Sequence, residues 1–233
     1  MGLIPDELHV WPAGANEAVD IQRRLKRKLV LFGDLDDVRL ITAVDTAYYE
    51  GNSRLYAAAV TMQLPDMSEV ECTVAEMEVT FPYVPALLSF REGPVVMKVL
   101  SQLNTAPDVM MFAAHGIAHP RGFGLASHMG LLMDIPSVGC ARRLLSGEFQ
   151  PIDTGRGACT PLYCANINSG YVYRTKANVK PMFVSPGHKC SMKAALDLVV
   201  RCLTEYRMPE PLRQAHLFVS KYKKSSRMKK AQM

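Results

Sequence analysis

Apolar residues recur along the chain with two periods, which predict a succession of helices and strands. Over residues 15–31, charged residues alternate with Leu, Val and Ile in a helical period, so we predict an amphipathic N-terminal helix there. Three β-prone runs follow, at 40–49, 56–63 and 70–80, with turns at 50–53 and 64–66 between them. These runs predict an antiparallel meander.

The pattern after residue 90 changes to alternating helices and strands. We predict helices at 94–103, 123–133, 191–206 and 209–219, and strands at 109–114, 137–141, 170–175 and 181–184. Pro94 and Pro209 would open helices, and Ser191 would cap one. A meander followed by alternating elements implies an α/β fold, one mixed sheet with helices on its faces. We expect a single domain over 15–220, an N-terminal extension at 1–14 and a basic C-terminal tail at 221–233.

Composition narrows the class of protein. The 233 residues are 48% hydrophobic and 21% charged, which suits a soluble domain with a sizeable core. No apolar run approaches the ~18 residues that span a bilayer, so no membrane segment is expected. Residues 1–11 contain Asp6 and Glu7 and do not resemble a signal peptide. Six scattered cysteines without a C-x-x-C pair indicate neither zinc nor disulfides, and favour a reducing cytoplasm.

The net charge of +5 is unevenly distributed. One basic cluster spans Arg23–Lys28 and another spans Lys221–Lys230. Such clusters attract phosphate backbones without reading sequence. Each is equally explained by a solvated helix face or a frayed basic tail.

Two acids and one aromatic loop are candidates for chemistry. Asp45 lies inside an apolar strand, where a carboxylate must be paired, for example with a buried Arg, or bound to a metal. Glu92 precedes the helix predicted from Pro94, where the helix dipole alone would favour it. In Phe81–Pro85, two prolines stiffen a loop around Tyr83, which either wedges between stacked bases or packs under the loop.

The strand predicted at 109–114 ends in a loop rich in His, Gly, Pro and Arg. Ligands gather at the carboxyl ends of strands in open α/β sheets, so a site is expected here. His115, His119 and His128 lack compact zinc spacing, and are either phosphate or water contacts or hydrogen-bonded loop residues. Arg142 and Arg143 add positive charge. The strand end itself carries Ala113 and Ala114 and no acid.

Taken in order, these segments closely resemble the endonuclease V family of inosine-directed nucleases, over roughly residues 15–220. The segments that carry the resemblance are Val44–Tyr48, Phe81–Pro85, Leu87–Pro94, His115–Arg121, Phe123–His128, Asp134–Gly139, Ser185–His188 and Arg207–His216. The resemblance implies a ribonuclease-H-like fold. It also implies hydrolysis of the second phosphodiester 3′ to inosine in DNA or RNA, supported by Mg²⁺ or, in its place, Mn²⁺.

The resemblance assigns roles to particular residues. Asp45 and Glu92 would hold the metal, His216 would lie near it, and Arg142 would replace a Lys at the scissile phosphate. Tyr83, beside Pro82, would be the wedge. The surroundings of the base and the substrate backbone would include Leu88, Gly116, His119 and Arg121.

Two departures from the family pattern matter. Ala113 and Ala114 stand where the family has Asp-Gly, and that Asp is a principal metal ligand; Ala86 stands where Gly is usual. Asp108 cannot substitute, because it lies at the other end of the strand, about 16 Å away. Ala113 is either a deliberate change that keeps substrate bound but uncut or the mark of a natural member with lost or altered activity. The retained site residues favour the first.

The sequence therefore predicts an inosine-directed endonuclease impaired by Ala113. The alternatives are a non-cutting reader of inosine or distorted nucleic acid, and a structure-directed nuclease of the same fold. DNA and RNA both stay open as substrates, and a monomer is expected.

Overall fold

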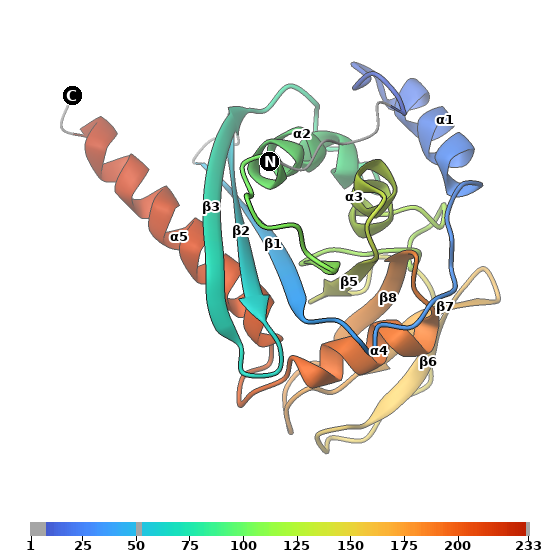
Figure 1. The fold of residues 1–233 in the computed structure, drawn as a ribbon. Helices are drawn as coiled ribbons and strands as arrows, with labels where there is room; N and C mark the ends of the chain where they lie inside the picture. Colours follow the sequence, from blue (N-terminus) through green and yellow to red (C-terminus); the bar gives the residue numbers. More distant parts are fainter. Residues whose placement is uncertain (1–7, 50–52, 232–233) are drawn as a thin grey trace.

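A computed structural model describes residues 8–49 and 53–231, in which one mixed eight-stranded sheet carries helices on both faces (Figure 1). Its strands are β1 (Leu40–Tyr48), β2 (Arg54–Gln63), β3 (Ser68–Glu78), β4 (Val109–Phe112), β5 (Ser137–Ala141), β6 (Cys159–Cys164), β7 (Ile167–Tyr173) and β8 (Met182–His188). The spatial order is β3-β2-β1-β4-β5-β8-β7-β6. The first three strands form the predicted antiparallel meander, and β1, β4 and β5 run parallel. The predicted α/β class is confirmed.

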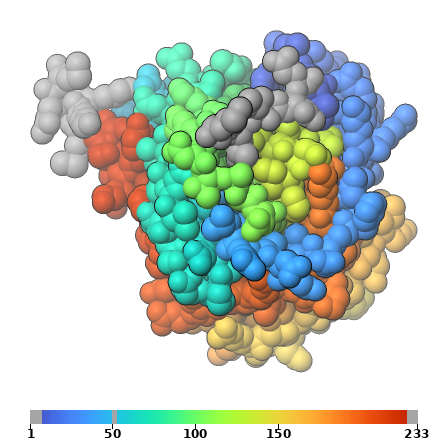
Figure 2. All heavy atoms as spheres, viewed as in Figure 1, coloured from blue at the N-terminus to red at the C-terminus, as the bar shows by residue number. Residues whose placement is uncertain are grey.

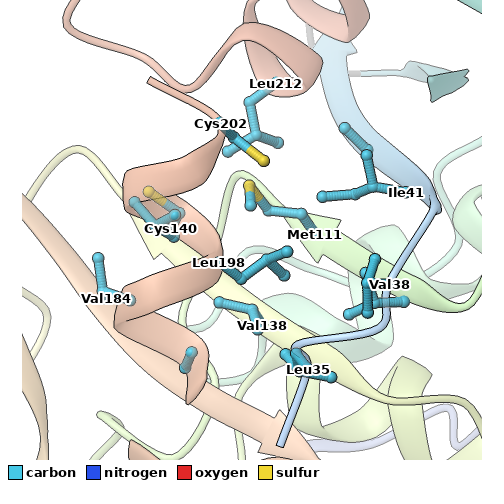
Figure 3. Packing of buried hydrophobic residues seen from close by; sticks show 14 of the residues in the cluster. Leu35, Val38, Ile41, Met111, Val138, Cys140, Val184, Leu198, Cys202 and Leu212 are labelled. Carbon is cyan, nitrogen blue, oxygen red and sulfur yellow. The ribbon is translucent and has the colours of Figure 1, made fainter. Parts of the chain in front are cut away.

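The helices divide between the two faces of the sheet. They are α1 (Ala15–Lys26), α2 (Leu88–Leu100), α3 (Leu125–Met133), α4 (Met192–Arg201) and α5 (Glu210–Ala231). On one face, Met111 of β4 packs with Leu198 of α4 and Leu212 of α5 (Figure 3). On the other, Phe112 of β4 packs with side chains of α2 and α3. Neighbouring residues of a strand therefore point to opposite layers.

Helix α1 lies outside these two layers. Its residues Ile21 and Leu25 pack against Phe90 of α2 and Phe123, which precedes α3. The helical period of the sequence predicts that this helix runs to residue 31, but it ends at Lys26. Beyond it the backbone bonds elsewhere: the amide of Lys189 donates to the carbonyl of Val30 at 2.7 Å.

Two further elements differ from the sequence prediction. Helix α2 begins at Leu88, so Pro94 lies inside it and Glu92 is a helical residue. Strand β6 was not predicted; it pairs with β7 across Ala165 and Asn166, whose φ values are 50° and 62°. An Ala at a left-handed turn position is uncommon, so the hairpin lacks its usual Asn-Gly signal.

Helix α5 continues well past residue 219. Tyr222 extends its apolar stripe by packing against Tyr56 of β2, with ring centroids 5.6 Å apart. The last turns reach beyond the sheet, and they stand at the edge of the molecular body (Figures 1 and 2). The basic segment from residue 221, for which the sequence left a frayed tail open, is therefore helical through Ala231.

The cap of α4, the turn at 50–53 and the cysteines were also predicted from the sequence. Ser191 caps α4, accepting a hydrogen bond from the Ala194 amide at 3.2 Å. The turn predicted at 50–53 lies, apart from Ser53, outside the described residues. All six cysteines are free thiols. None of the helices within 8–49 and 53–231 has the length and apolar character needed to cross a membrane.

Candidate active site

Asp45 and Ala113 lie side by side at the carboxyl ends of two parallel strands. The register pairs Val44 of β1 with Phe112 of β4, so the next pair is Asp45 and Ala113. The amide of Ala113 donates to the carbonyl of Val44 at 3.2 Å, which holds the chains together up to this point. A carboxylate at 113 would thus stand next to Asp45, at the ~5 Å spacing of neighbouring strands. Two carboxylates at that spacing repel each other unless a cation lies between them.

Asp45 is buried, and both of its carboxylate oxygens are engaged. His216 of α5 donates from Nδ1 to Oδ2 at 2.8 Å, and the amide of Thr46 donates to Oδ1 at 2.9 Å. The partner of this buried acid is therefore a histidine, where the sequence suggested an arginine as one possibility. The half-exposed His216 ring joins Asp45 to solvent on the α5 face.

Glu92 approaches the same strand end from the opposite face. It is buried on α2 and accepts a hydrogen bond from the Tyr48 hydroxyl at 2.9 Å. Burial raises the pKa of Glu92 to about 7, and the nearby negative charge of Asp45 adds to the rise. The helix-terminus explanation of Glu92 is wrong, because the residue lies in the second turn of α2.

The two acids do not complete a metal cluster. Among residues 8–49 and 53–231, no group of three His, Cys, Asp or Glu side chains is arranged to hold a metal ion. Asp108 does not compensate, since its carboxylate accepts from the amides of Arg39 and Leu40 at the far end of β1. The remaining acids supply hard oxygen ligands of the kind Mg²⁺ prefers, but too few of them.

A cavity of about 790 Å³ opens beside this strand end. Its lining includes predicted site residues from four separate segments, namely Tyr83, Leu88, Ala113, His119 and Arg142. The carboxyl end of β4 therefore links the acids to a cavity large enough for a nucleobase. Arg143, Lys180 and Arg207 also line the cavity and make one side of it cationic. Nothing in the local pattern of Lys180 marks it as a site residue, and Arg207 begins one of the segments that carry the resemblance but receives no role from it.

The loop before α2 presents its aromatic residue to solvent. The Tyr83 side chain is 70% exposed, and its neighbours Pro82 and Pro85 are exposed as well. Tyr83 is therefore not packed under the loop. Residues 81–86, the wedge loop, hold a rigid aromatic ring at the rim of the cavity.

The three histidines of the sequence prediction have three different environments. His119 is buried and donates from Nε2 to the Ala86 carbonyl at 2.9 Å. His115 donates from Nε2 to the Arg143 carbonyl at 2.9 Å. His128 is fully buried on α3, contacts His9 at 2.7 Å and does not line the cavity. Burial lowers the pKa of all three, to about 4 for His119.

Two other predicted site residues, Gly116 and Arg121, contact the segments next to the cavity. Gly116 is packed so tightly that a Cβ would lie 2.1 Å from the Pro186 carbonyl oxygen. Arg121 points inward, donating to the Ala86 carbonyl at 2.7 Å and to the side chain of Gln22. Neither residue lines the cavity.

The chain is similar in sequence and in structure to proteins of one family. A family model described as Endonuclease V matches residues 23–217. The Endonuclease V of Methanothrix thermoacetophila is 43% identical over 227 residues, which cover 97% of this chain and 100% of that protein. The crystal structure of the Endonuclease V from Streptomyces avermitilis matches with a TM-score of 0.87 at 33% identity, covering 97% of this chain and 99% of that one. The Ciona intestinalis Endonuclease V, solved with a 24mer DNA containing an inosine followed by a ribo-adenosine, has the same fold at 24% identity, with a TM-score of 0.79 and coverage of 90% and 98%.

Proposed function

Because the chain belongs to the endonuclease V family, a family of phosphodiester hydrolases, we propose that it recognises inosine in nucleic acid through a complete base site but is impaired in cutting by Ala113. The cleavage step would be that of the family, at the second phosphodiester 3′ to inosine and with Mg²⁺ or Mn²⁺. The observation that carries the proposal is the shared cavity, where Tyr83, His119 and Arg142 meet the strand end at Ala113.

Base recognition rests on the wedge loop and the cavity behind it. Taking a base out of its stack costs a few kcal/mol, and less for a mismatched base. The exposed Tyr83 ring can fill the space that the base leaves, while the cavity receives the base itself. The Ciona protein, which has the same fold, is in complex with a DNA that contains an inosine, and this supports the proposal.

Phosphate binding would use the cationic side of the cavity. Arg142 is exposed on the loop after β5, and Arg143, Lys180 and Arg207 lie near it on the cavity wall. Arg207 donates to the carbonyls of Arg142 and Pro181, both at 2.9 Å, so it fixes the backbone that presents Arg142. The guanidinium of Arg142, presented on this fixed backbone, can pair with a phosphate in two hydrogen bonds.

The metal would be held by Asp45 and Glu92. When bound, Mg²⁺ would activate water and neutralise charge developing on the phosphate. Asp45 is kept in place by His216, and Glu92 must lose its proton to serve, since burial raises its pKa to about 7. Ala113, at the strand end beside Asp45, offers no oxygen, so among the described residues the third ligand that would complete this pair is missing.

The direct test restores the acid. Ala113→Asp should nick an inosine-containing oligonucleotide in Mg²⁺, at least a hundredfold faster than the chain as it stands, by analogy with other lost site groups. Ala113→Asn is the matched control, because it has the same shape without the charge. An Ala113→Asp protein that folds and binds inosine DNA but stays inert would refute the proposed mechanism. Equal cutting of flaps without inosine would point instead to a structure-directed nuclease.

A second function is favoured by the incomplete metal set among the described residues. The chain could serve as a reader that binds inosine without cutting. Comparing the affinity for inosine and adenine strands without metal tests this function. Equal affinities would remove it, whereas a preference for inosine together with absent nicking would support it. Running DNA and RNA strands in parallel decides which is the better ligand.

We propose a cytoplasmic protein, since its six thiols are unpaired, and a monomer. Light scattering at working concentration would test the oligomeric state.

A further inference from the structure

A buried glutamine on α1 connects three segments behind the cavity. Gln22 is completely buried, although it lies on a helix whose other polar residues face solvent. A buried carboxamide is costly unless its donors and acceptor are used. Gln22 uses both ends: Nε2 donates to the carbonyls of Ala86 at 3.1 Å and Phe123 at 3.0 Å, and Oε1 accepts from Arg121 Nε.

The Ala86 carbonyl is the common acceptor of this arrangement. Besides Gln22, it accepts from His119 Nε2 at 2.9 Å and from an Arg121 terminal nitrogen at 2.7 Å. The Arg121 amide donates to His119 Nδ1 at 3.1 Å, which fixes the neutral form of that ring. We call these four residues, Gln22, Ala86, His119 and Arg121, the Ala86 network.

The network holds a backbone position that is strained by itself. Ala86 has φ of 63°, a left-handed conformation that a residue with a Cβ rarely adopts. Such strain persists only where the surroundings determine the conformation. Three donors on one carbonyl provide that determination. Ala86 itself lines the cavity, as do Tyr83 before it in the wedge loop and Leu88 after it at the start of α2.

We propose that Gln22 is a positioning residue for base recognition, which sets the wedge loop through the Ala86 carbonyl without touching the substrate. Gln22 does not line the cavity, and its partners lie 64 and 101 residues away along the chain. In the wedge loop, Phe81 is buried against Phe90, whereas Pro82, Tyr83 and Pro85 are exposed. The loop is therefore anchored at its start by Phe81 and at its end by the hydrogen bonds of the Ala86 network.

The inference rests on the proposed inosine preference and makes a selective prediction. Gln22→Met keeps the length of the side chain and removes its hydrogen bonds. We expect the ratio of inosine to adenine affinity to fall about tenfold, the equivalent of about one hydrogen bond. Affinity for the adenine strand should change less than twofold, because the cationic side of the cavity is untouched. Asn16→Met, at an exposed position of the same helix, should leave both affinities unchanged.

A readout without nucleic acid separates this inference from the proposed function. Hydrogen exchange at the backbone amides of residues 83–88 should accelerate in Gln22→Met, while exchange in β1 and β4 stays the same. Gln22→Glu provides a second variant if Gln22→Met does not fold, since it keeps the acceptor for Arg121 and loses the donors to Ala86. No inosine preference in the unaltered chain would refute the proposed function. A normal preference retained by Gln22→Met, or an equal loss for both strands, would overturn the role of Gln22.

Discussion

The wedge loop and the strand end at Ala113 line the same cavity, with Asp45 and Glu92 outside its lining, and the two regions are built to very different degrees of completeness. Around the wedge loop, a single carbonyl accepts three hydrogen bonds, and an aromatic ring is held exposed. At the strand end, Asp45 of β1 has Ala113 as its neighbour after β4, and Glu92 approaches from α2 on the opposite face of the sheet. Under the proposed function, this difference assigns recognition to the wedge loop and the impaired cutting step to the strand end.

The largest expected effect concerns Arg142, the cation proposed at the scissile phosphate. In the Ala113→Asp background, Arg142→Ala should lower the rate of nicking about 10²–10³-fold, since a positioned cation no longer stabilises the transition state. Affinity for the uncut strand should fall far less. Single-turnover rates with excess enzyme measure the effect, and Arg143→Ala is the neighbouring control. Equal losses in both variants would mean that Arg142 has no special position.

A smaller effect is expected on the recognition side. Tyr83→Ala should weaken binding of an inosine strand about tenfold to a hundredfold, as loss of base stacking does elsewhere. Tyr83→Phe should bind nearly normally, because the ring is retained. Fluorescence anisotropy with labelled oligonucleotides measures both. Unchanged affinity in Tyr83→Ala would place the wedge elsewhere.

Acid should damage the recognition side through His119. Burial, together with Arg121, His115 and Lys26 nearby, lowers its pKa from 6.5 to about 4, so the folded protein favours the neutral ring. A lowered pKa gives stability that is fully present above pH 6.5 and is lost as the pH falls towards 4. Urea unfolding at pH 7 and 4.5 should show a loss roughly 2 kcal/mol smaller in His119→Gln than in the unaltered chain. The same loss in both would show that His119 is not responsible.

The smallest effect concerns the end of α5, which belongs to neither side of the cavity. Lys221, Lys223 and Lys224 lie on α5 beside Tyr222, which packs against Tyr56 of β2, and the helix continues from there past the sheet (Figure 1). Replacing all three with Gln should reduce the slope of log affinity against log salt by up to about 2.7, at about 0.9 per phosphate contact. The preference for inosine should not change. An unaltered salt slope would exclude this helix from the interface.

Much of the fold was predictable because apolar residues recur with a clear period in elements that bury one face against the core. Strand β1 follows from it almost to the residue, and helix α4 begins after its predicted cap at Ser191 but ends at Arg201, short of the predicted residue 206. Strand β6 was missed because its turn uses Ala165 in a left-handed conformation. The sequence predicts that helix α2 begins at Pro94, because proline is tolerated at a first helical position. The helix begins at Leu88 instead, and Phe90 in its first turn packs against Phe81 of the wedge loop.

The site was predictable only where a motif marks it. Asp45, Tyr83 and Arg142 come from recognisable segments, and the structure places them around one strand end and its cavity. Gln22 was not predictable, because a lone glutamine on an amphipathic helix has no signal of its own. Its importance depends on three distant segments meeting, which local pattern does not encode.

Calorimetric titration of Mg²⁺ tests the central claim most directly, that one missing carboxylate separates recognition from cutting. Three proteins are compared at pH 8, above the raised pKa of Glu92: the unaltered chain, Ala113→Asp and Ala113→Asn. We predict that Ala113→Asp binds Mg²⁺ at least tenfold more tightly than the other two, while all three bind an inosine strand equally. Equal Mg²⁺ affinity in all three proteins would contradict the account.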